Sequence, residues 1–331
     1  MAFDTVLSGR FQPDKLAHAK VRKGSNRVAA LLRWGIGLFW ILAGILQFQP
    51  LMFTPDFYEW YPPSIMESTI QSTADGQPHL VVTLVHFGSS VWATHPILFN
   101  VLAATLQLCI GLAMIFGPTR IIRIGLWVSV IWGALVWLMG EAFGGVFGGS
   151  SYFDGFPGAA LLYVISAFLL LAFAFRENSF LALRTSLRYL VTAYWFVVAF
   201  LQVIPSSGFW DPSTLMAPFA NEAAQPGPAF LARPVEWFAL FTQSNTGAIN
   251  AVMILLMVIM AFLTLLDLWN KATITIAVAW LLWSWWFGQG FGAIFTGSGT
   301  DPNSIPVIAL WMLCLWGVRF RGRPGGHHSG V

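Results

Sequence analysis

The chain of 331 residues is 57% hydrophobic and only 9% charged, and its formal net charge is +3. Soluble domains carry about 25% charged residues, so this composition excludes an ordinary water-soluble domain. Together with a mean hydropathy of +0.70, it indicates an integral membrane protein. The 17 Trp and 29 Phe residues suit rings that lie at lipid headgroups and between packed helices, so they require no cofactor.

Residues 1–32 form a basic segment that precedes the first apolar stretch and contains no signal-peptide cleavage pattern. We interpret this segment as a cytoplasmic tail whose charge fixes the topology, with contact to anionic lipid headgroups as the alternative. Its basic residues are Arg10, Lys15, Lys20, Arg22, Lys23 and Arg27, and Arg33 follows directly after it.

Eight apolar stretches have nearly the length needed to cross a hydrocarbon core of about 30 Å at about 1.5 Å per helical residue. We therefore predict an all-α integral membrane fold with about eight transmembrane helices, arranged as two tandem four-helix bundles in parallel orientation. The first repeat is expected at 33–183 and the second at 184–319, followed by a cytoplasmic tail at 320–331. The predicted spans are 34–49, 96–116, 124–139, 158–175, 189–204, 247–266, 273–287 and 306–318.

The distribution of charge supports this layout. With the N-terminus in the cytoplasm, every Lys and Arg except Arg233 falls on the cytoplasmic side, as the positive-inside rule requires. An even number of spans then places both termini in the cytoplasm, which predicts a multi-pass protein of the bacterial cytoplasmic (inner) membrane. The outer segments instead collect acidic residues: Asp56, Glu59, Glu67, Asp75, Asp154, Asp211, Glu222, Glu236 and Asp301, with Glu141 at the outer end of the third span.

An internal repeat relates the two halves of the chain. Its clearest match aligns Gly140-Glu141-Ala142-Phe143-Gly144 with Gly288-Gln289-Gly290-Phe291-Gly292. Because four spans return the chain to its starting side, the copies are expected to be parallel repeats rather than inverted ones. Further matched positions are Gln47 and Gln202, Asn100 and Asn250, Phe147 and Phe295, Asp154 and Asp301, and Pro157 and Pro306.

Each half also contains a long outer segment, at about 51–94 and 206–245, whose length exceeds that of a plain turn. Their apolar parts predict amphipathic helices that lie on or dip into the outer face of the membrane. The glycine-rich segments 144–158 and 292–306 are irregular and apolar. We expect protein to cover them, or a wet cavity to adjoin them, because irregular backbone in lipid lacks hydrogen-bond partners.

Glu141 ends a helix otherwise composed of Trp, Val, Leu and Ile, and its counterpart in the second half is the neutral Gln289. Carboxylates within a membrane are costly and often mark ion or proton pathways. The alternative is a carboxylate that is solvated at the headgroup level or bonded to loop amides. Glu141 and Gln289 are therefore candidate functional residues.

Asp154 and Asp301 lie in the glycine-rich segments, where such side chains commonly form Asx turns with their own backbone. The functional alternative is that both segments converge on the pseudo-symmetry axis and form the floor of an outward-facing pocket. Gln47 and Gln202 would add hydrogen-bonding groups near that pocket, although helix-to-helix hydrogen bonds explain them equally well.

Three histidines, His79, His86 and His95, fall in or beside the first outer segment, near several carboxylates. Imidazole and carboxylate groups on one face can bind a transition metal or relay protons, so these residues are candidate metal ligands. A surface or loop-ordering role is the alternative, because their spacing matches no specific metal motif. Cys109 and Cys314 are isolated in apolar stretches and indicate neither a disulfide nor a metal site.

The first span opens with Arg33, Leu38, Trp40, Gly44, Gln47 and Pro50. This pattern resembles the DoxX-like family of four-helix membrane proteins. The glycine-rich motifs at 140–145 and 288–304 also resemble a group of uncharacterised bacterial eight-helix proteins, so the resemblance covers about 33–319. It implies a four-helix bundle in each half and no agreed catalytic residues, and some DoxX relatives are subunits of thiosulfate:quinone oxidoreductases.

These features lead us to expect an accessory integral membrane subunit of a respiratory or other redox complex, with a quinone-binding groove near the outer leaflet. A transporter for a small solute or metal ion is the first alternative, and an outward-facing protein that handles copper or another metal is the second. The expected ligands are accordingly a quinone, a lipid or a metal ion. The expected partners are membrane lipids and other membrane subunits. Because no nucleotide loop, hydrolase motif or haem-attachment motif appears, we expect neither autonomous catalysis nor a nucleic-acid partner.

Overall fold

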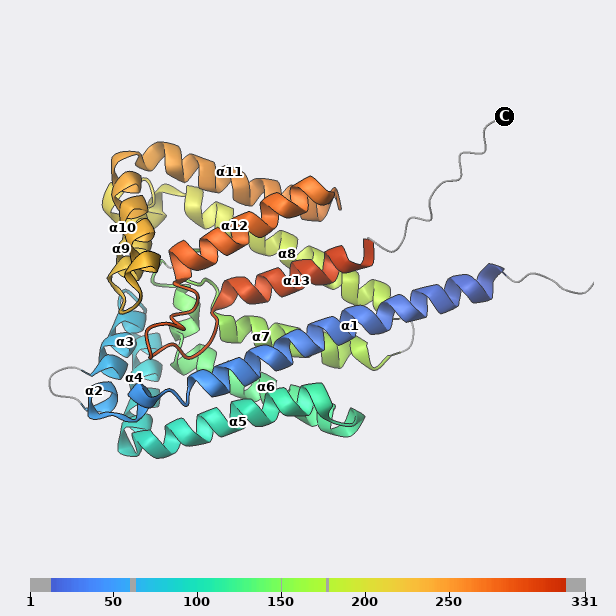
Figure 1. The fold of residues 1–331 in the computed structure, drawn as a ribbon, viewed down its shortest axis with the longest axis horizontal. Helices are drawn as coiled ribbons and strands as arrows, with labels where there is room; N and C mark the ends of the chain where they lie inside the picture. Colours follow the sequence, from blue (N-terminus) through green and yellow to red (C-terminus); the bar gives the residue numbers. More distant parts are fainter. Residues whose placement is uncertain (1–12, 60–63, 150, 177–178, 320–331) are drawn as a thin grey trace, which may run out of the picture.

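The computed structural model describes residues 13–59, 64–149, 151–176 and 179–319, and all regular structure within these ranges is helical. The prediction of an all-helical chain is thereby confirmed for this part of the sequence. Figure 1 shows long helices that run side by side as a bundle. They are α1 (Pro13–Leu46), α5 (Pro96–Phe116), α6 (Thr119–Met139), α7 (Ala159–Leu169), α8 (Phe180–Val203), α11 (Thr246–Leu265), α12 (Lys271–Gln289) and α13 (Ser304–Arg319).

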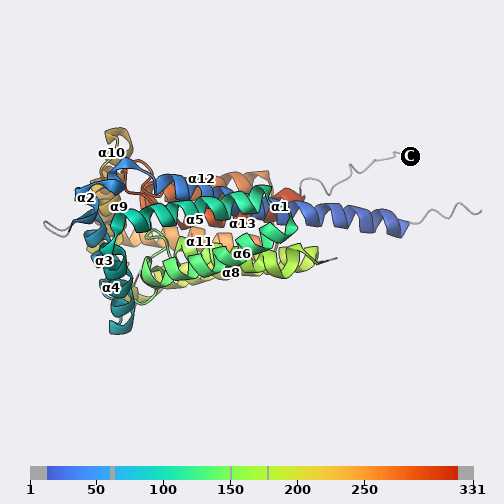
Figure 2. The same ribbon diagram turned by 90° about the horizontal axis from the view of Figure 1, so that it is seen from below.

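Short helices gather at one end of the bundle, which we call the short-helix end (Figure 1). In Figure 2, α3 and α4 stand across the direction of the long helices. The helices at this end are η1 (Pro50–Phe53), α2 (Pro55–Tyr58), α3 (Ile65–Ala74), α4 (His79–Thr94), η4 (Pro205–Ser207), α9 (Pro212–Ala224) and α10 (Ala229–Ser244). The two predicted outer segments therefore do contain helices of their own.

Among the residues that the structure describes, five helices are long and apolar enough to cross a membrane: Arg27–Leu46, Pro96–Phe116, Thr119–Met139, Leu181–Val203 and Thr246–Leu265. Two further apolar helices are shorter, Ala159–Ala174 and Ser304–Gly317; the first combines α7 with the single π-helical turn η3 (Leu170–Ala174). Helix α12 has 19 residues, but four Trp residues dilute its aliphatic content. This set of apolar helices indicates a membrane-embedded protein.

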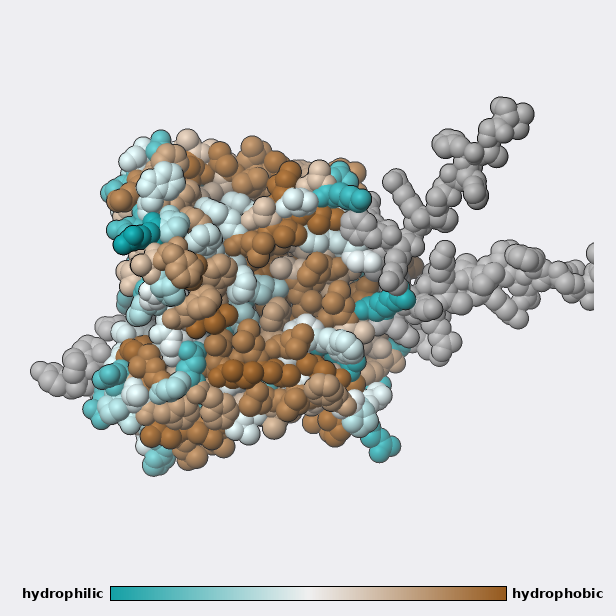
Figure 3. Space-filling model, in the orientation of Figure 1, coloured by the Kyte–Doolittle hydropathy of each residue, from teal (hydrophilic) through white to brown (hydrophobic). Residues whose placement is uncertain are grey.

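The outside of the bundle is hydrophobic along its length. Leu38, Ile131 and Leu255 are 57%, 61% and 58% exposed, although each belongs to a long helix. Figure 3 shows the consequence for one face, where hydrophobic residues dominate the middle and hydrophilic residues lie mostly toward the ends. Soluble proteins rarely expose continuous apolar surface on this scale, so this face is suited to lipid.

Two pairs of long helices pack along each other: α1 packs along α5, and α8 packs along α11. Small residues permit the first contact, since a Cβ on Gly111 would lie 2.5 Å from the carbonyl oxygen of Gly37. Close backbone approach thus holds α1 and α5 together where lipid supplies no hydrophobic driving force.

Helix α1 begins at Pro13, about 20 residues before the predicted first span. Most of the predicted basic tail is therefore continuous with the spanning helix rather than separate from it. Val28, Leu32 and Ile36 recur at four-residue intervals and are at most 3% exposed, so one stripe of α1 packs into the core before the apolar stretch starts.

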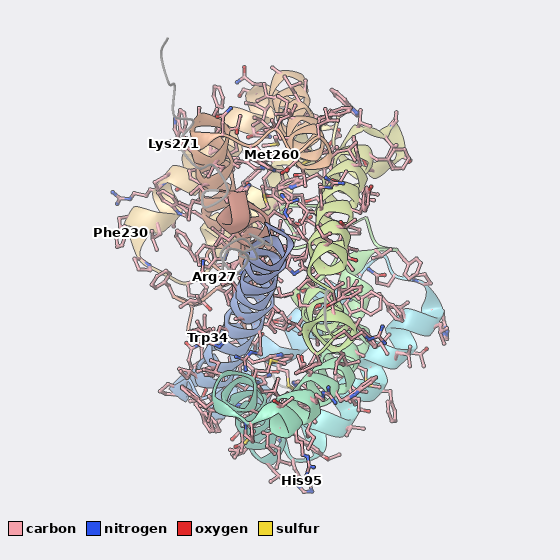
Figure 4. The ribbon with its side chains drawn as sticks, turned by 90° about the vertical axis from the view of Figure 1, so that its right-hand side faces the viewer. Arg27, Trp34, His95, Phe230, Met260 and Lys271 are labelled. Atoms are coloured by element: carbon pink, nitrogen blue, oxygen red, sulfur yellow. The ribbon has the colours of Figure 1, made fainter. Side chains whose placement is uncertain are left out.

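The connections α5–α6, α7–α8 and α11–α12 lie at the end opposite the short helices, where α1 also begins (Figure 1). We call this the basic end, because it carries Arg120 and Arg123 in the first turns of α6 and Lys271 at the start of α12. Figure 4 views the bundle from this end and labels Arg27 and Lys271. Arg184 of α8 forms an ion pair with Asp267 here, with 3.1 Å between Nη2 and Oδ2.

Candidate functional site

Two glycine-rich loops at the short-helix end adopt the same backbone conformation. Four consecutive residues in each loop have positive φ angles: 45°, 61°, 65° and 70° in the loop after α6, and 48°, 57°, 73° and 54° in the loop after α12. These residues are Ala142, Phe143, Gly144 and Gly145 in the first loop (where η2 is Ala142–Gly145) and Gly290, Phe291, Gly292 and Ala293 in the second. Such a run is strained for residues with a Cβ, so its repetition shows a shared local fold.

In each loop, a tryptophan from the preceding helix donates a hydrogen bond to a proline carbonyl oxygen. The indole N–H of Trp137 donates to the carbonyl oxygen of Pro157 at 2.8 Å, and Trp285 donates to Pro302 at 2.8 Å. The equivalent of Pro157 is therefore Pro302, and the sequence-based pairing of Pro157 with Pro306 is wrong. The pairing of Asp154 with Asp301 fails for the same reason, because the second loop reaches its proline three residues sooner (from Gly144 to Pro157 against Gly292 to Pro302).

The two loops touch each other. Gln289 at the end of α12 donates from Nε2 to the carbonyl oxygen of Tyr152 in the first loop at 3.3 Å. A Cβ on Gly155 would lie 2.5 Å from Oδ1 of Asn303, which places the two loops in van der Waals contact. The expectation that both glycine-rich segments converge agrees with these contacts.

The loops, α3 and α9 enclose an open cavity of about 620 Å³. Binding pockets for small molecules commonly have volumes of about 300–1,000 Å³, so this cavity has the size of a ligand site. Glycine is the commonest residue of its wall, and Ser, Thr, Asn and Gln residues also contribute. The lining includes five carboxylate residues: Asp75, Glu141, Asp154, Glu222 and Asp301.

Glu141 is the second residue after the end of α6, and its side chain contacts the start of α7. Its two carboxylate oxygens accept the backbone N–H of Ala160 at 3.2 and 3.3 Å, which satisfies an amide in the first turn of α7. Burial raises the pKa of Glu141 to about 8, the charge of Asp301 adds to the rise, and the hydrogen bonds from Ala160 and Ala159 oppose it. A proton on this carboxyl is therefore stable at neutral pH.

Asp301 and Asp154 are held by local hydrogen bonds, as the Asx-turn interpretation predicts. One oxygen of Asp301 accepts the backbone N–H of Asn303. Oδ2 of Asp154 accepts both the hydroxyl of Ser151 at 2.7 Å and its backbone N–H at 3.0 Å. Burial raises the pKa of both carboxyls, and these hydrogen bonds oppose the rise. Both groups also line the cavity, so the local bonds orient them without removing them from it.

Glu222 reaches the cavity from α9 in the second outer segment. A Cβ on Gly290 would lie 2.1 Å from Oε2 of Glu222. The Glu222 carboxylate therefore occupies space that is open only because residue 290 is glycine. Burial raises the pKa of Glu222 to about 7, and the charge of Asp154 contributes to the rise. The carboxylates of α9 and of the first loop thus influence each other across the cavity.

The described lining residues include no Lys, Arg or His, so the negative charge of the cavity has no basic counterpart there. Carboxylates crowded into a partly buried space favour either protonation or the entry of a cation. This arrangement can therefore exchange protons for a positively charged ligand.

The remaining candidate residues have other positions. Gln289 lines the cavity but is itself only 1% exposed; it donates to the Ser304 hydroxyl and accepts the N–H of Ile305. Gln47 and Gln202 do not belong to the cavity lining. Gln47 donates to Asn100 between α1 and α5, and Gln202 donates to Asn250 at 2.9 Å between α8 and α11. Helix-to-helix hydrogen bonds, the alternative interpretation, account for both.

The structure does not bring the three candidate histidines together. His79 and His86 lie on α4, and His95 lies between α4 and α5. Within the described ranges, no group of three or more His, Cys, Asp and Glu side chains is close enough to hold a metal ion. The carboxylates of the cavity are accordingly distributed around its wall rather than directed at one point.

Sequence reasoning did not single out Asp75 or Glu222 as site residues. Both were recognised only as acidic residues of the outer segments, and neither lies in a repeated motif. The one signal that pointed to them was the excess of acidic residues in the outer segments, where Arg233 is the only lysine or arginine.

No family model, no curated protein and no solved structure matches this chain. The resemblance to DoxX-like proteins therefore stays a prediction.

Proposed function

We propose that the chain is an eight-span protein of the bacterial inner membrane, with two parallel four-helix repeats and both termini in the cytoplasm. Five helices of sufficient length and hydropathy support the spans, with α7, α12 and α13 running alongside them. The matched Gln–Asn pairs and the matched tryptophan–proline hydrogen bonds support the repeat. The basic connections opposite the short-helix end support the topology.

Labelling of single cysteines in whole cells tests this topology. In a variant without native cysteines, an impermeant thiol reagent added outside should label Gly227→Cys between α9 and α10. It should not label Leu268→Cys between α11 and α12. Both positions are exposed, so accessibility within the protein does not distinguish them. Labelling of Leu268→Cys from outside would exclude the proposed orientation.

We further propose that the cavity binds a small organic polycation from the outer side and that the protein transports it. One observation carries this proposal: five carboxylate residues and no basic residue among the described residues that line a cavity of about 620 Å³. Ammonium groups match such a site, because each one donates hydrogen bonds to a carboxylate and to the loop carbonyls.

A flexible aliphatic polyamine fits this arrangement better than a single metal ion. Its ammonium groups are spaced along a chain and can meet carboxylates on different walls. A metal ion instead needs several ligands at about 2.0–2.6 Å from one point, and the described carboxylates form no such group. The duplicated bundle with irregular backbone at the site is also typical of transporters.

Binding and uptake of radiolabelled spermidine test the proposal. The purified protein should bind spermidine saturably, and the double variant Asp154→Asn/Asp301→Asn should weaken binding at least tenfold, because it removes two charges while keeping the shape of both side chains. Glu236→Gln is the matched control, since Glu236 is an exposed carboxylate on α10 outside the cavity lining. Equal affinity in all three proteins, or no saturable binding, would exclude this function.

An accessory subunit of a redox complex is the second candidate. A hollow beside α10 favours it, because Trp286, Phe291 and Phe295 give the hollow an apolar, aromatic wall. Its volume of about 50 Å³ is below the usual range for a ligand pocket, so the larger polar cavity has more support. Co-purification of quinone and further subunits from native membranes, without spermidine binding, would favour the redox subunit.

A further inference from the structure

The two repeats differ in one feature at the place where each glycine-rich loop begins. In the first repeat Glu141 accepts a hydrogen bond from the first turn of α7, and in the second Gln289 accepts one from the first turn of α13. Gln289 also donates two hydrogen bonds to protein groups, to Ser304 and Tyr152. A carboxylate has no hydrogen to donate unless it binds a proton, so only the first repeat can hold an exchangeable proton at this position.

A second carboxylate lies within electrostatic reach of Glu141. Asp301 comes from the opposite loop, both residues line the cavity, and the charge of Asp301 disfavours ionisation of Glu141. Two like charges in a partly buried space cannot both be stable, so such a pair titrates as a unit and retains one proton longer than an isolated carboxyl does.

A buried hydroxyl lies on α7, three residues after Ala160, whose N–H Glu141 accepts. Tyr163 on α7 is 2% exposed, and its hydroxyl has no hydrogen-bond partner. The charges that act on this hydroxyl are those of Asp301 and Glu141. Buried polar groups almost always have a partner, so a hydroxyl on which these two carboxyls act is a candidate donor to them.

The other charged or titratable residues around Glu141 are also acidic. The cavity wall adds Asp154 from the first loop, Glu222 from α9 and Asp75 from the segment after α3. Among the described lining residues no cation neutralises them. A positive charge that enters the cavity therefore favours the ionised form of every carboxyl there. The effect is greatest for a carboxyl that holds a proton, because that proton can leave.

We propose that Glu141 and Asp301, with the Tyr163 hydroxyl as a donor, share one exchangeable proton in the cavity wall, and that a cation entering the cavity displaces it. The proton site stands on the shared cavity wall of the two carboxyls and on the unpaired Tyr163 hydroxyl of the helix that Glu141 contacts, whereas the displacement step rests on the proposed function as a polycation transporter. In that step one proton leaves for the solvent as one ammonium group takes its place. The pair thereby couples uptake of the cation to release of a proton.

Infrared spectroscopy of the purified protein tests the proton site without any ligand. At pH 7 the wild type should show the carbonyl stretch of a protonated carboxyl group. Glu141→Gln and Asp301→Asn should each reduce this band, with the remainder coming from other buried carboxyls such as that of Glu222. Tyr163→Phe should shift its frequency, because the band reports hydrogen bonding to the carboxyl. The exposed-carboxylate variant Glu236→Gln should leave the band unchanged. An unchanged band in Glu141→Gln and Asp301→Asn would overturn the proton site.

Addition of spermidine then tests the displacement. In the wild type the band should disappear as spermidine saturates the protein, and a pH indicator in weak buffer should report acidification. Glu141→Gln should still bind spermidine but release much less acid, whereas Glu236→Gln, whose carboxylate lies outside the cavity lining, should retain the release. Spermidine binding with an unchanged band would overturn the coupling. If spermidine does not bind while the band still depends on Glu141, the polycation function is excluded and the proton site stands.

Discussion

Glu141 and Gln289 occupy equivalent positions, and each side chain accepts a backbone hydrogen bond from the first turn of the helix that follows it, α7 or α13. One molecule thus contains an ionisable and a neutral version of the same contact. The neutral version is fully satisfied by protein groups, which shows that the contact itself requires no charge. The negative charge of Glu141 is therefore not needed for this hydrogen bond, and replacing its carboxylate by an amide should have little effect on the fold.

Glu141→Gln should change how stability depends on pH. Because the folded pKa of Glu141 is raised from 4.5 to about 8, the folded state retains a proton that the unfolded state releases. Its contribution to stability is fully present below about pH 4.5 and is lost as pH rises through about 8. The wild type should therefore lose thermal stability, by several degrees, between pH 5 and pH 8.5, and Glu141→Gln should lose less.

Thermal unfolding in detergent at several pH values measures this difference. Glu236→Gln should follow the wild-type profile, because its carboxylate is exposed. A Glu141→Gln profile that parallels the wild type would show that Glu141 does not hold a proton in the folded protein.

The reverse exchange, Gln289→Glu, should destabilise the protein. The new carboxylate cannot donate to the Ser304 hydroxyl or to the Tyr152 carbonyl oxygen, and this position is only 1% exposed. Loss of partners for a buried group costs about 1–3 kcal/mol and more for a charged one. The loss should be larger at pH 8 than at pH 5, since a protonated carboxyl restores one donor.

Gln225→Glu provides the control for this exchange. Gln225 also lines the cavity, but it is exposed, so its replacement should cost little at either pH. Melting temperatures of both variants at pH 5 and pH 8 give the comparison. Equal losses at the two pH values would contradict the structural role of the Gln289 amide hydrogens.

The loop backbone leads to a third expectation, which contrasts two glycines. A Cβ on Gly144 would lie 1.8 Å from the carbonyl oxygen of Pro157, and its φ is +65°. Gly149 has a similar φ of +82°, but a Cβ there would meet no heavy atom within 4 Å, so this position tests backbone strain alone. Gly149→Ala should cost about 1–2 kcal/mol, whereas Gly144→Ala should cost considerably more or abolish folding.

Expression level, melting temperature and gel-filtration profile report this contrast. Gly149 also belongs to the cavity lining, so the contrast is read from stability rather than from spermidine binding. If the two variants were equally stable, the loop after α6 would not pack against Pro157 as described.

The charge pattern and the glycine motifs together predicted where functional groups would gather. Glu141, Asp154, Asp301 and Gln289 stood out because polar residues are rare near apolar stretches, and all four line the cavity. A membrane sequence permits this prediction because placing a polar side chain in lipid costs free energy, so each polar residue near an apolar stretch needs a reason. The roles of these residues stay predictions.

The sequence could not provide contacts between distant segments. Glu222 meets the loop of Gly290, 68 positions away along the chain, and no local pattern encodes that approach. The alignment of the second loop with the first could not be read from the sequence either. A glycine-rich segment can be aligned in several ways, and Pro306 and Pro302 match Pro157 equally well. The hydrogen bonds of the two tryptophans identify Pro302 as the equivalent residue.

Gln47 leads to the last expectation, because its position separates a structural role from a functional one. It is 7% exposed and donates to Asn100, whose Nδ2 donates in return to the Gln47 carbonyl oxygen at 3.1 Å. Gln47→Leu leaves Oδ1 of Asn100 without its donor. Hydrogen bonds between membrane helices contribute about 0.6 kcal/mol on average and at most about 2, so the variant should lose stability on this scale. Its spermidine affinity should stay within twofold of the wild type, because the pair lies outside the cavity lining. Gln202→Leu should behave in the same way, since Gln202 makes the equivalent bond to Asn250. A large loss of affinity in either variant, at unchanged stability, would mean that these glutamines act on the ligand rather than on helix packing.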